Sequence, residues 1–196
     1  MEGRPPPVFG VRLYGNPIKG QVPARGRACV VDFPGAADAL AQTLLARTMA
    51  LIDAEFPTLA ADLFGGDTTL KALHDAGELE YSYKEPAINV YTPGGEFVPH
   101  KDLQSLTLLL PLSSPGDGAD VGSYRGGGTG FWHHRRREGG SVALKAETVA
   151  TILRPQAGTA MLFGGQVEHA GIAVEAGRRV MLVASFTRNI PLSKSS

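Results

Sequence analysis

The stretch INVYTPGGEFVPHKD, from Ile88 to Asp102, sets the pattern from which the fold of this chain is predicted. It consists of two short apolar runs separated by a Pro-Gly-Gly turn. Short apolar runs that are bounded by Gly and Pro are typical of β-strands joined by tight turns. The pattern predicts strands over 87–92 and 97–101, and the second strand brings a histidine and a carboxylate, His100 and Asp102, close together.

Short β-rich segments of the same kind continue towards the C-terminus, with Gly, Pro, Ser or Asp between them. The predicted strands are 87–92, 97–101, 106–112, 129–133, 148–153, 159–163, 168–174 and 179–187. Many short strands separated by turn signals are typical of a double-sheet barrel or jelly roll. The Gly-rich stretches 113–128 and 138–141 are predicted to be loops, and the first is long enough to have a function.

The segment before these strands has a helical pattern. Residues 36–54 are rich in Ala and Leu, contain no Gly or Pro, and repeat their larger apolar residues at roughly helical spacing. These apolar residues are Leu40, Leu44, Leu45 and Ile52. Shorter helices are predicted over 59–64 and 68–76, with Asp67 as the N-cap of the second. The fold class that we expect is therefore mainly β with supporting α-helices.

The length of the chain fits one domain. A sequence of 196 residues is long enough to bury a full hydrophobic core. We expect a single domain over 1–196, with N-terminal strands and support helices in 1–78 and the β core in 79–190.

Charge and cysteine content narrow the classes of function. Basic and acidic residues are equal in number, so the formal net charge is zero, which does not favour a nucleic-acid partner. A local basic patch is still compatible with this charge balance. The lone Cys29 cannot form an internal disulfide. The chain has no apolar signal core and no run of membrane length. We therefore expect a soluble, intracellular, cytoplasmic protein with no membrane partner.

The pair His100 and Asp102 has the spacing of two metal ligands on one strand. Residues i and i+2 of a strand face the same side, so the imidazole and the carboxylate converge. A second histidine from a distant strand would complete a set of two histidines and one carboxylate, which is diagnostic of non-haem Fe(II) oxygenases. Alone, the His-x-Asp motif is weak, because a strand with a polar face would show the same pattern.

The other histidines differ in how well they could supply the third ligand. His74 lies in a predicted helix and is expected to be a surface or packing residue. His133 and His134 are adjacent, so at most one can face inward, and they precede the cationic run 135–137. His169 opens a predicted strand after a Gly-Gly turn and is the favoured third ligand.

Several spaced motifs together resemble the prolyl-4-hydroxylase-like family of Fe(II)- and 2-oxoglutarate-dependent dioxygenases. They cover about half of the chain, and they lie in 88–102, 106–112, 126–132, 155–163 and 169–186. The resemblance implies a double-stranded β-helix (jelly-roll) core in which His100, Asp102 and His169 hold Fe(II). It also implies 2-oxoglutarate as cosubstrate, dioxygen as the oxidant and ascorbate as an optional cofactor.

The resemblance assigns further residues to the cosubstrate. Arg179 matches the basic residue that binds the distal carboxylate of 2-oxoglutarate, which a guanidinium can do through two parallel hydrogen bonds. The adjacent Arg178 would face the other side of the strand. Tyr91 matches a tyrosine that contacts the cosubstrate or lines the pocket, and a packed aromatic is the alternative. Asn89 lies on the same face of the strand as Tyr91. This Asn-x-Tyr motif resembles one in the nucleic-acid alkylation-repair oxygenases. The Arg-rich motif near the C-terminus of that family is absent from 179–188.

The function implied by the resemblance is hydroxylation of a prolyl or other residue in a peptide or protein. The presence of Asp102 favours hydroxylation over halogenation, because related halogenases lack this carboxylate. The alternatives are a small-molecule or nucleic-acid substrate, a cupin-type metal protein in which Arg179 has no role, and a jelly-roll binding module without turnover. The loops 113–128 and 135–146 are candidate flaps over the substrate, and Asp117, Asp120 and Tyr124 are candidate contacts in the first.

Overall fold

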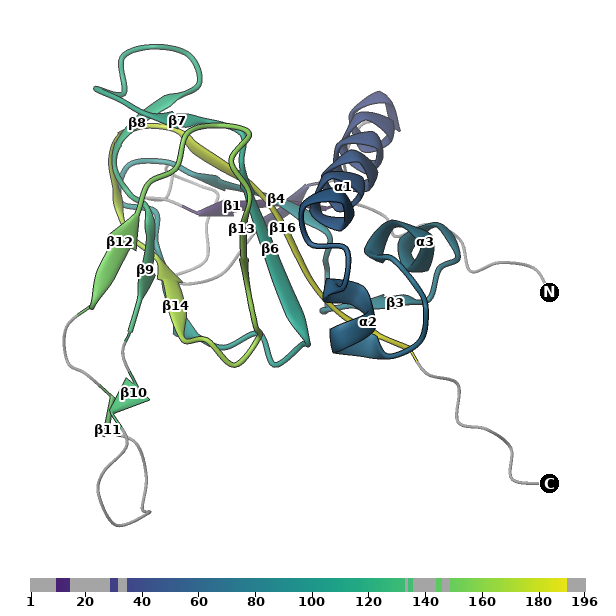
Figure 1. Cartoon of the computed structure of the whole chain (residues 1–196). Helices are drawn as coiled ribbons and strands as arrows, with labels where there is room; N and C mark the ends of the chain where they lie inside the picture. Colours follow the sequence, from purple (N-terminus) through teal and green to yellow (C-terminus); the bar gives the residue numbers. More distant parts are fainter. Residues whose placement is uncertain are drawn as a thin grey trace.

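The computed structural model describes residues 10–14, 29–31, 35–132, 134–135, 144–145 and 149–189. Within these residues the chain is mainly antiparallel β, with three helices. Figure 1 shows the helices packed together at one side of the strands, beside the long strand β16 (Arg179–Arg188). No helix in the described part of the chain is long and apolar enough to cross a membrane.

The three helices agree closely with the predicted ones. They are α1 (Gly35–Glu55), α2 (Leu59–Phe64) and α3 (Leu70–Asp75). The prediction that Asp67 caps α3 is wrong, because the N-cap is Thr69, whose hydroxyl accepts a hydrogen bond from the backbone N–H of Ala72 at 3.1 Å. Leu40 does not face the core and is 70% exposed, since the buried face of α1 is formed by Ala41, Leu45, Met49 and Ile52.

The largest sheet has the order β13-β6-β16-β4-β1-β2, and β3 also pairs with β16. Its strands besides β16 are β1 (Gly10–Tyr14), β2 (Cys29–Val31), β3 (Leu79–Tyr81), β4 (Ala87–Tyr91), β6 (Leu106–Pro111) and β13 (Met161–Phe163). Strand β1 runs parallel to β4, and all other pairs in this sheet are antiparallel.

A second sheet has the order β12-β9-β14-β5 and is fully antiparallel. Its strands are β5 (Phe97–His100), β9 (Thr129–Phe131), β12 (Thr151–Leu153) and β14 (His169–Gly171). A third sheet, β15-β8-β7, consists of β7 (Ser114–Pro115), β8 (Ser123–Gly126) and β15 (Val174–Gly177). The short strands β10 (His134–Arg135) and β11 (Leu144–Lys145) pair with each other.

Each predicted strand segment contains a strand, but several details of the prediction are wrong. The predicted loop 113–128 contains β7 and β8, the segment 168–174 is divided between β14 and the start of β15, and β3 is a strand that the pattern did not predict. These strands are short and lack regular apolar alternation. Their pairing depends on neighbours that are distant in sequence, such as β15 for β8. The predicted loop 138–141 lies outside the described residues.

Strand β16 separates the core into two parts because its side chains alternate between two faces. Leu182, Ala184 and Phe186 pack in the apolar cluster that includes the helices. Met181 and Val183 point to the opposite face and belong to a second cluster with Tyr91 and Tyr124. The side chains on this second face line the pocket described next.

Candidate metal centre

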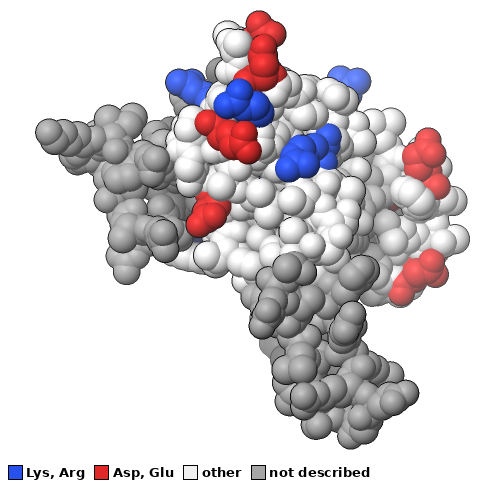
Figure 2. Space-filling model, turned by 90° about the vertical axis from the view of Figure 1, so that its left-hand side faces the viewer, with Lys and Arg blue, Asp and Glu red and all other residues white. Residues whose placement is uncertain are grey.

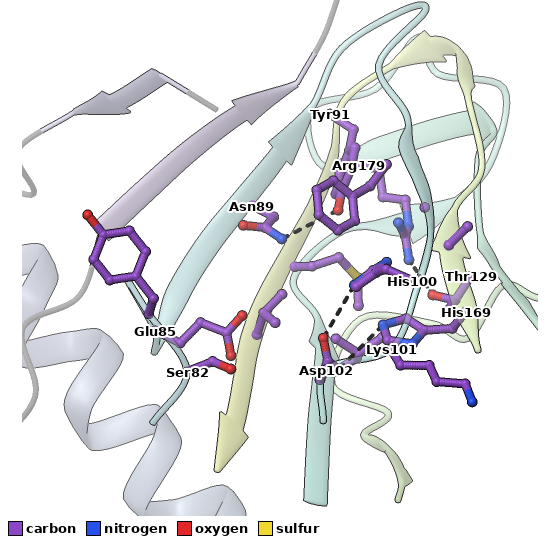
Figure 3. A pocket seen from close by; sticks show the side chains of 17 residues that line it. Ser82, Glu85, Asn89, Tyr91, His100, Lys101, Asp102, Thr129, His169 and Arg179 are labelled. Carbon is purple, nitrogen blue, oxygen red and sulfur yellow. Dashed lines mark hydrogen bonds and ion pairs between the residues drawn. The ribbon is translucent and has the colours of Figure 1, made fainter. Parts of the chain in front are cut away.

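A pocket of about 250 Å³ lies between the two larger sheets. Residues of β4, β6 and β16 line it from the first sheet, and residues of β5, β9 and β14 line it from the second. Figure 3 shows that its polar side chains come from both sheets and point towards one another. The pocket contains all six residues that the sequence assigned to the metal and the cosubstrate, which are Asn89, Tyr91, His100, Asp102, His169 and Arg179.

His100, Asp102 and His169 lie together in this pocket. One nitrogen or oxygen atom from each of them can be chosen so that all three atoms lie within 4.8 Å of one another. The two histidines are directly paired in the register of β5 and β14. Asp102 differs slightly from the prediction, because β5 ends at His100 and the carboxylate lies two residues later, outside any strand.

The hydrogen bonds of the two imidazoles orient them for metal binding. Nδ1 of His100 lies 2.9 Å from the carbonyl oxygen of Val98, and Nδ1 of His169 lies 3.1 Å from that of Val167. A carbonyl oxygen can only accept, so each Nδ1 carries the proton and each Nε2 of the neutral ring presents a lone pair.

These two Nε2 atoms both face the carboxylate of Asp102. They lie 3.3 Å (His100 to Oδ1) and 3.6 Å (His169 to Oδ2) from its oxygens. Two lone pairs and a carboxylate that face one another need a cation or a proton between them.

The environment keeps two of these groups in the forms that bind metal. Burial by itself raises the pKa of Asp102, but its contact with His100, the hydrogen bond from Thr107 and the proximity of both histidines outweigh it, so the pKa of this carboxyl is lower than usual. Burial, followed by the proximity of His100, lowers the pKa of His169. At neutral pH the pocket therefore presents an ionised carboxylate and a neutral imidazole.

Arg179 is a buried cation in the same pocket. Its side chain is only 3% exposed, one guanidinium nitrogen donates a hydrogen bond to Thr129 Oγ1 at 2.7 Å, and the guanidinium carbon lies 5.2 Å from the centre of the Tyr91 ring. Its Nε has no hydrogen-bond partner, and no carboxylate pairs with it, among the residues that the structure describes. Arg178 is exposed. A buried guanidinium without a counter-anion is suited to binding an anionic ligand.

Asn89 and Tyr91 lie beside this arginine on β4. Both are buried, and the register pairs Tyr91 with Arg179 and Asn89 with Met181. Asn89 Nδ2 donates a long hydrogen bond of 3.4 Å to the Tyr91 hydroxyl. Asn89 Oδ1 has no partner among the described residues, so this amide is a further polar group that a ligand could satisfy.

The other candidate residues lie elsewhere. His74 packs on α3 with its Nδ1 2.8 Å from the Tyr81 hydroxyl, as expected of a packing residue. His133 and residues 136–143 lie outside the described residues, as does most of the predicted flap 135–146. Asp117 and Asp120 are exposed and do not line the pocket, and Tyr124 is 1% exposed within an apolar cluster.

Thr107 was not found by sequence reasoning, although it is the one hydroxyl residue in the apolar run of β6. It is fully buried, and its hydroxyl donates a hydrogen bond of 2.6 Å to Oδ2 of Asp102. Such a bond fixes the orientation of a ligand carboxylate.

Replacing Thr107 by valine is expected to weaken Fe(II) binding by about 10- to 100-fold, because the side chain keeps its shape but loses the hydroxyl. Anaerobic calorimetric titration with Fe(II) measures this affinity. Thr107→Ser keeps a hydroxyl and is expected to stay close to the wild-type value. Equal affinities for the valine variant and the wild type would show that this bond does not position Asp102.

Gly165 connects the two chain segments that carry Asp102 and His169. Its carbonyl oxygen accepts a hydrogen bond of 3.0 Å from the backbone N–H of Leu103, next to Asp102, and β14 with His169 follows closely in the chain. A Cβ atom at Gly165 would lie 2.1 Å from the carbonyl oxygen of Gln104, whereas one at Gly164 would have nothing within 4 Å. Only a residue without a side chain fits at Gly165.

Gly165→Ala is therefore expected to displace the segment after Asp102 and to reduce Fe(II) affinity by at least ten-fold, on the scale of lost support for metal ligands. Gly164→Ala is the matched control and is expected to leave the affinity unchanged. Thermal melting of both variants separates a local displacement from general unfolding. A Gly165→Ala variant with wild-type affinity would contradict the close approach.

Comparison with known proteins finds only distant structural similarity. No family model matches the chain, and no curated protein matches it. A solved structure of a 2OG-Fe(II) oxygenase family oxidoreductase from Burkholderia pseudomallei aligns over 85% of this chain with a TM-score of 0.46 and 18% identity. A prolyl-4-hydroxylase from Pseudomonas putida aligns over 81%, with a TM-score of 0.44 and 18% identity. The chain spans 62% of the first protein and 70% of the second.

Proposed function

We propose that this chain is a non-haem Fe(II)- and 2-oxoglutarate-dependent oxygenase that hydroxylates a residue of a peptide or protein. The observation that carries the proposal is one pocket that contains both the triad His100, Asp102 and His169 and the unpaired cation Arg179. The proposed fold is a single domain with a double-stranded β-helix (jelly-roll) core over 79–190. A cupin-type metal protein would leave Arg179 without a role.

The donor set of the triad fits Fe(II). Two imidazole nitrogens and one carboxylate occupy one face of an octahedral ion and leave the opposite positions open to ligands. When bound, iron and the keto acid would supply a coupled oxidation, in which dioxygen accepts two electrons from 2-oxoglutarate, which becomes succinate and carbon dioxide, and two from a substrate C–H bond, which becomes C–OH. The protein residues hold, orient and shield the reactants.

Arg179 would bind the distal carboxylate of 2-oxoglutarate. Thr129 and Tyr91 hold the guanidinium in place, and its unpaired Nε is a donor that an acid would satisfy. Asn89 and Tyr91 would contact the same cosubstrate through the amide and the hydroxyl. Ascorbate is an optional reductant in this proposal.

A peptide is the proposed substrate, and a prolyl residue is the first to test. Figure 2 shows that charged side chains are sparse on one face of the molecule and that both signs occur there. With a formal net charge of zero, such a surface offers little attraction to a phosphate backbone. A small molecule is the alternative, and the pocket of about 250 Å³ lies just below the range of roughly 300–1,000 Å³ that is typical of small-molecule sites.

The experiment that tests the proposal has two steps. The first is anaerobic titration of the protein with Fe(II) and then with 2-oxoglutarate. Calorimetry and the absorbance of the iron–keto-acid complex monitor the binding. The second is succinate release in air with pools of proline-containing peptides, single-stranded oligonucleotides and small molecules. Binding of both components together with peptide-stimulated succinate release is expected. Failure to bind 2-oxoglutarate in the presence of Fe(II) would overturn the proposal, and binding without turnover on any pool would favour a binding module.

A further inference from the structure

An apolar groove, here called the α1 groove, lies between helix α1 and the end of the large sheet. It has a volume of about 540 Å³ and shares no lining residue with the pocket of the candidate metal centre. One wall is a side of α1, and the other comes from β6, β13 and the chain just before β13, which is the last strand at this end of the sheet. Its larger apolar lining residues are Leu40, Leu44, Leu51, Ile52, Phe56, Leu110 and Leu162.

Large apolar side chains at this groove are exposed to solvent. Leu40 is 70% exposed, Leu51 67% and Phe56 55%, and Figure 1 shows α1 at the outside of the molecule. A hollow of about 360 Å³ adjoins the groove, shares Phe56 and Leu162 with it, and extends to Leu63 of α2. Contiguous exposed apolar surface of this kind marks an interaction site, whereas single exposed apolar residues are common.

Two opposite charges flank the middle of this surface. Arg47 and Glu55 both line the groove and are exposed, and neither forms an ion pair within the described part of the chain. The hydroxyls of Thr43 and Thr48 donate hydrogen bonds of 2.8 Å to carbonyl oxygens of α1 itself. The two charges are therefore the polar groups of the groove that are left to a partner.

The positions of these charges make the surface self-complementary. Arg47 lies four residues before Leu51 in the chain, and Glu55 lies four residues after it. When two identical helices pack antiparallel about a two-fold axis, a residue before the centre meets the residue at the same distance after the centre in the other copy. With the axis at Leu51, Arg47 of each copy faces Glu55 of the other, and the contact forms twice. An anionic partner would attract Arg47 but would be repelled by Glu55.

We propose that the chain forms a homodimer in which α1 of each copy packs antiparallel against α1 of the other along the α1 groove. The exposed leucines and the phenylalanine of each copy lose their contact with water at this interface, and this burial provides most of the affinity. The two Arg47–Glu55 pairs set the register. Helix α1 has 21 residues and is roughly 30 Å long, so the contact extends along a large part of the molecule. The inference is independent of the proposed function.

Sedimentation equilibrium of the whole chain over a dilution series tests the inference. We expect wild-type protein to have twice the mass of one chain and to dissociate on dilution. Leu51→Asp is expected to weaken the dimer by at least 100-fold, because it places two carboxylates against each other at the axis, and like charges in contact across an interface are strongly unfavourable. Leu153→Asp is the matched control, since Leu153 of β12 is 44% exposed and lies outside the groove. That control is expected to stay dimeric.

Charge reversal tests the proposed register. Arg47→Glu alone and Glu55→Arg alone are each expected to weaken the dimer by about ten-fold or more, because each puts two pairs of like charges in contact. Both substitutions in one chain are expected to restore the affinity to within about three-fold of the wild type. An equimolar mixture of the two single variants is also expected to dimerise, since each then meets the opposite charge on the other copy.

Circular dichroism and thermal melting show that each variant is folded before its mass is compared. Wild-type protein that stays monomeric over the whole series, or that forms a larger open assembly, would overturn the inference. A dimer that persists in folded Leu51→Asp, or that is lost in folded Leu153→Asp, would place the interface elsewhere and would overturn it as well. Failure of the double reversal to restore a dimer that the single reversals weaken would overturn the antiparallel register.

Discussion

Replacing Asp102 by alanine is expected to abolish stoichiometric Fe(II) binding and to lower succinate release by at least 100-fold. Loss of a residue that merely supports a metal ligand typically costs 10- to 100-fold in affinity, and Asp102 would be a ligand itself. It is also the one acid in the triad, so its removal leaves two neutral imidazoles to hold a dication. The methyl group of alanine neither coordinates the ion nor balances its charge.

The measurement is the iron content of the protein after anaerobic loading and desalting, followed by a succinate assay with saturating 2-oxoglutarate. Asp117→Ala is the matched control, because this exposed carboxylate accepts a hydrogen bond from Ala119 N–H and does not line the pocket. We expect that control to bind iron as the wild type does. Wild-type iron content in Asp102→Ala would remove this carboxylate from the proposed centre.

The second large effect is expected at the cosubstrate. Arg179→Ala should weaken 2-oxoglutarate binding by roughly 30-fold to several thousand-fold, the range that corresponds to about 2–5 kcal/mol for breaking a buried, hydrogen-bonded charge pair. Arg179 is 3% exposed and its guanidinium is held by Thr129 and Tyr91, so water cannot easily replace it. Arg179→Lys keeps the charge without the planar fork and is expected to give an intermediate affinity.

Arg178→Ala is the control for this prediction, because the neighbouring arginine is exposed and is expected to change the affinity less than about three-fold, as surface charges contribute little. Titration of 2-oxoglutarate into the Fe(II)-loaded protein without oxygen measures binding directly, and the KM for 2-oxoglutarate gives a second value. Equal losses for the two alanine variants would show that the cosubstrate does not bind on the Arg179 side of β16.

The local pattern of the sequence was sufficient for the helices and for most strands. The run of Ala and Leu in α1 is long enough to show helical spacing, and β6 is recognised as a short, continuous apolar run followed by Ser and Pro. The local sequence pattern did not predict β7 and β8. A strand of two residues, or one that contains Gly, forms only because it pairs with neighbouring strands. The burial of Tyr124 has the same origin, since apolar surroundings from distant parts of the chain cannot be read from a Gly-rich segment.

For the candidate site, the sequence by itself determined which chemical groups were available. It identified His100 and Asp102 by their spacing, favoured His169 among the remaining histidines, and indicated Arg179 through a family resemblance. Only the tertiary structure decided which groups meet. The pairing of β5 with β14 places His169 beside His100.

The tertiary structure also decided how the site is supported. Arg179 is buried at the start of β16, whereas Arg178 just before the strand is exposed. The pairing of β16 with β6 places Ser185 beside Thr107, and Ser185 N–H donates to Glu85. The physical reason is that contacts between strands far apart in the chain depend on the packing of the whole core. Residue spacing along a strand predicts which side chains share a face, but it does not predict which other strand lies beside that strand.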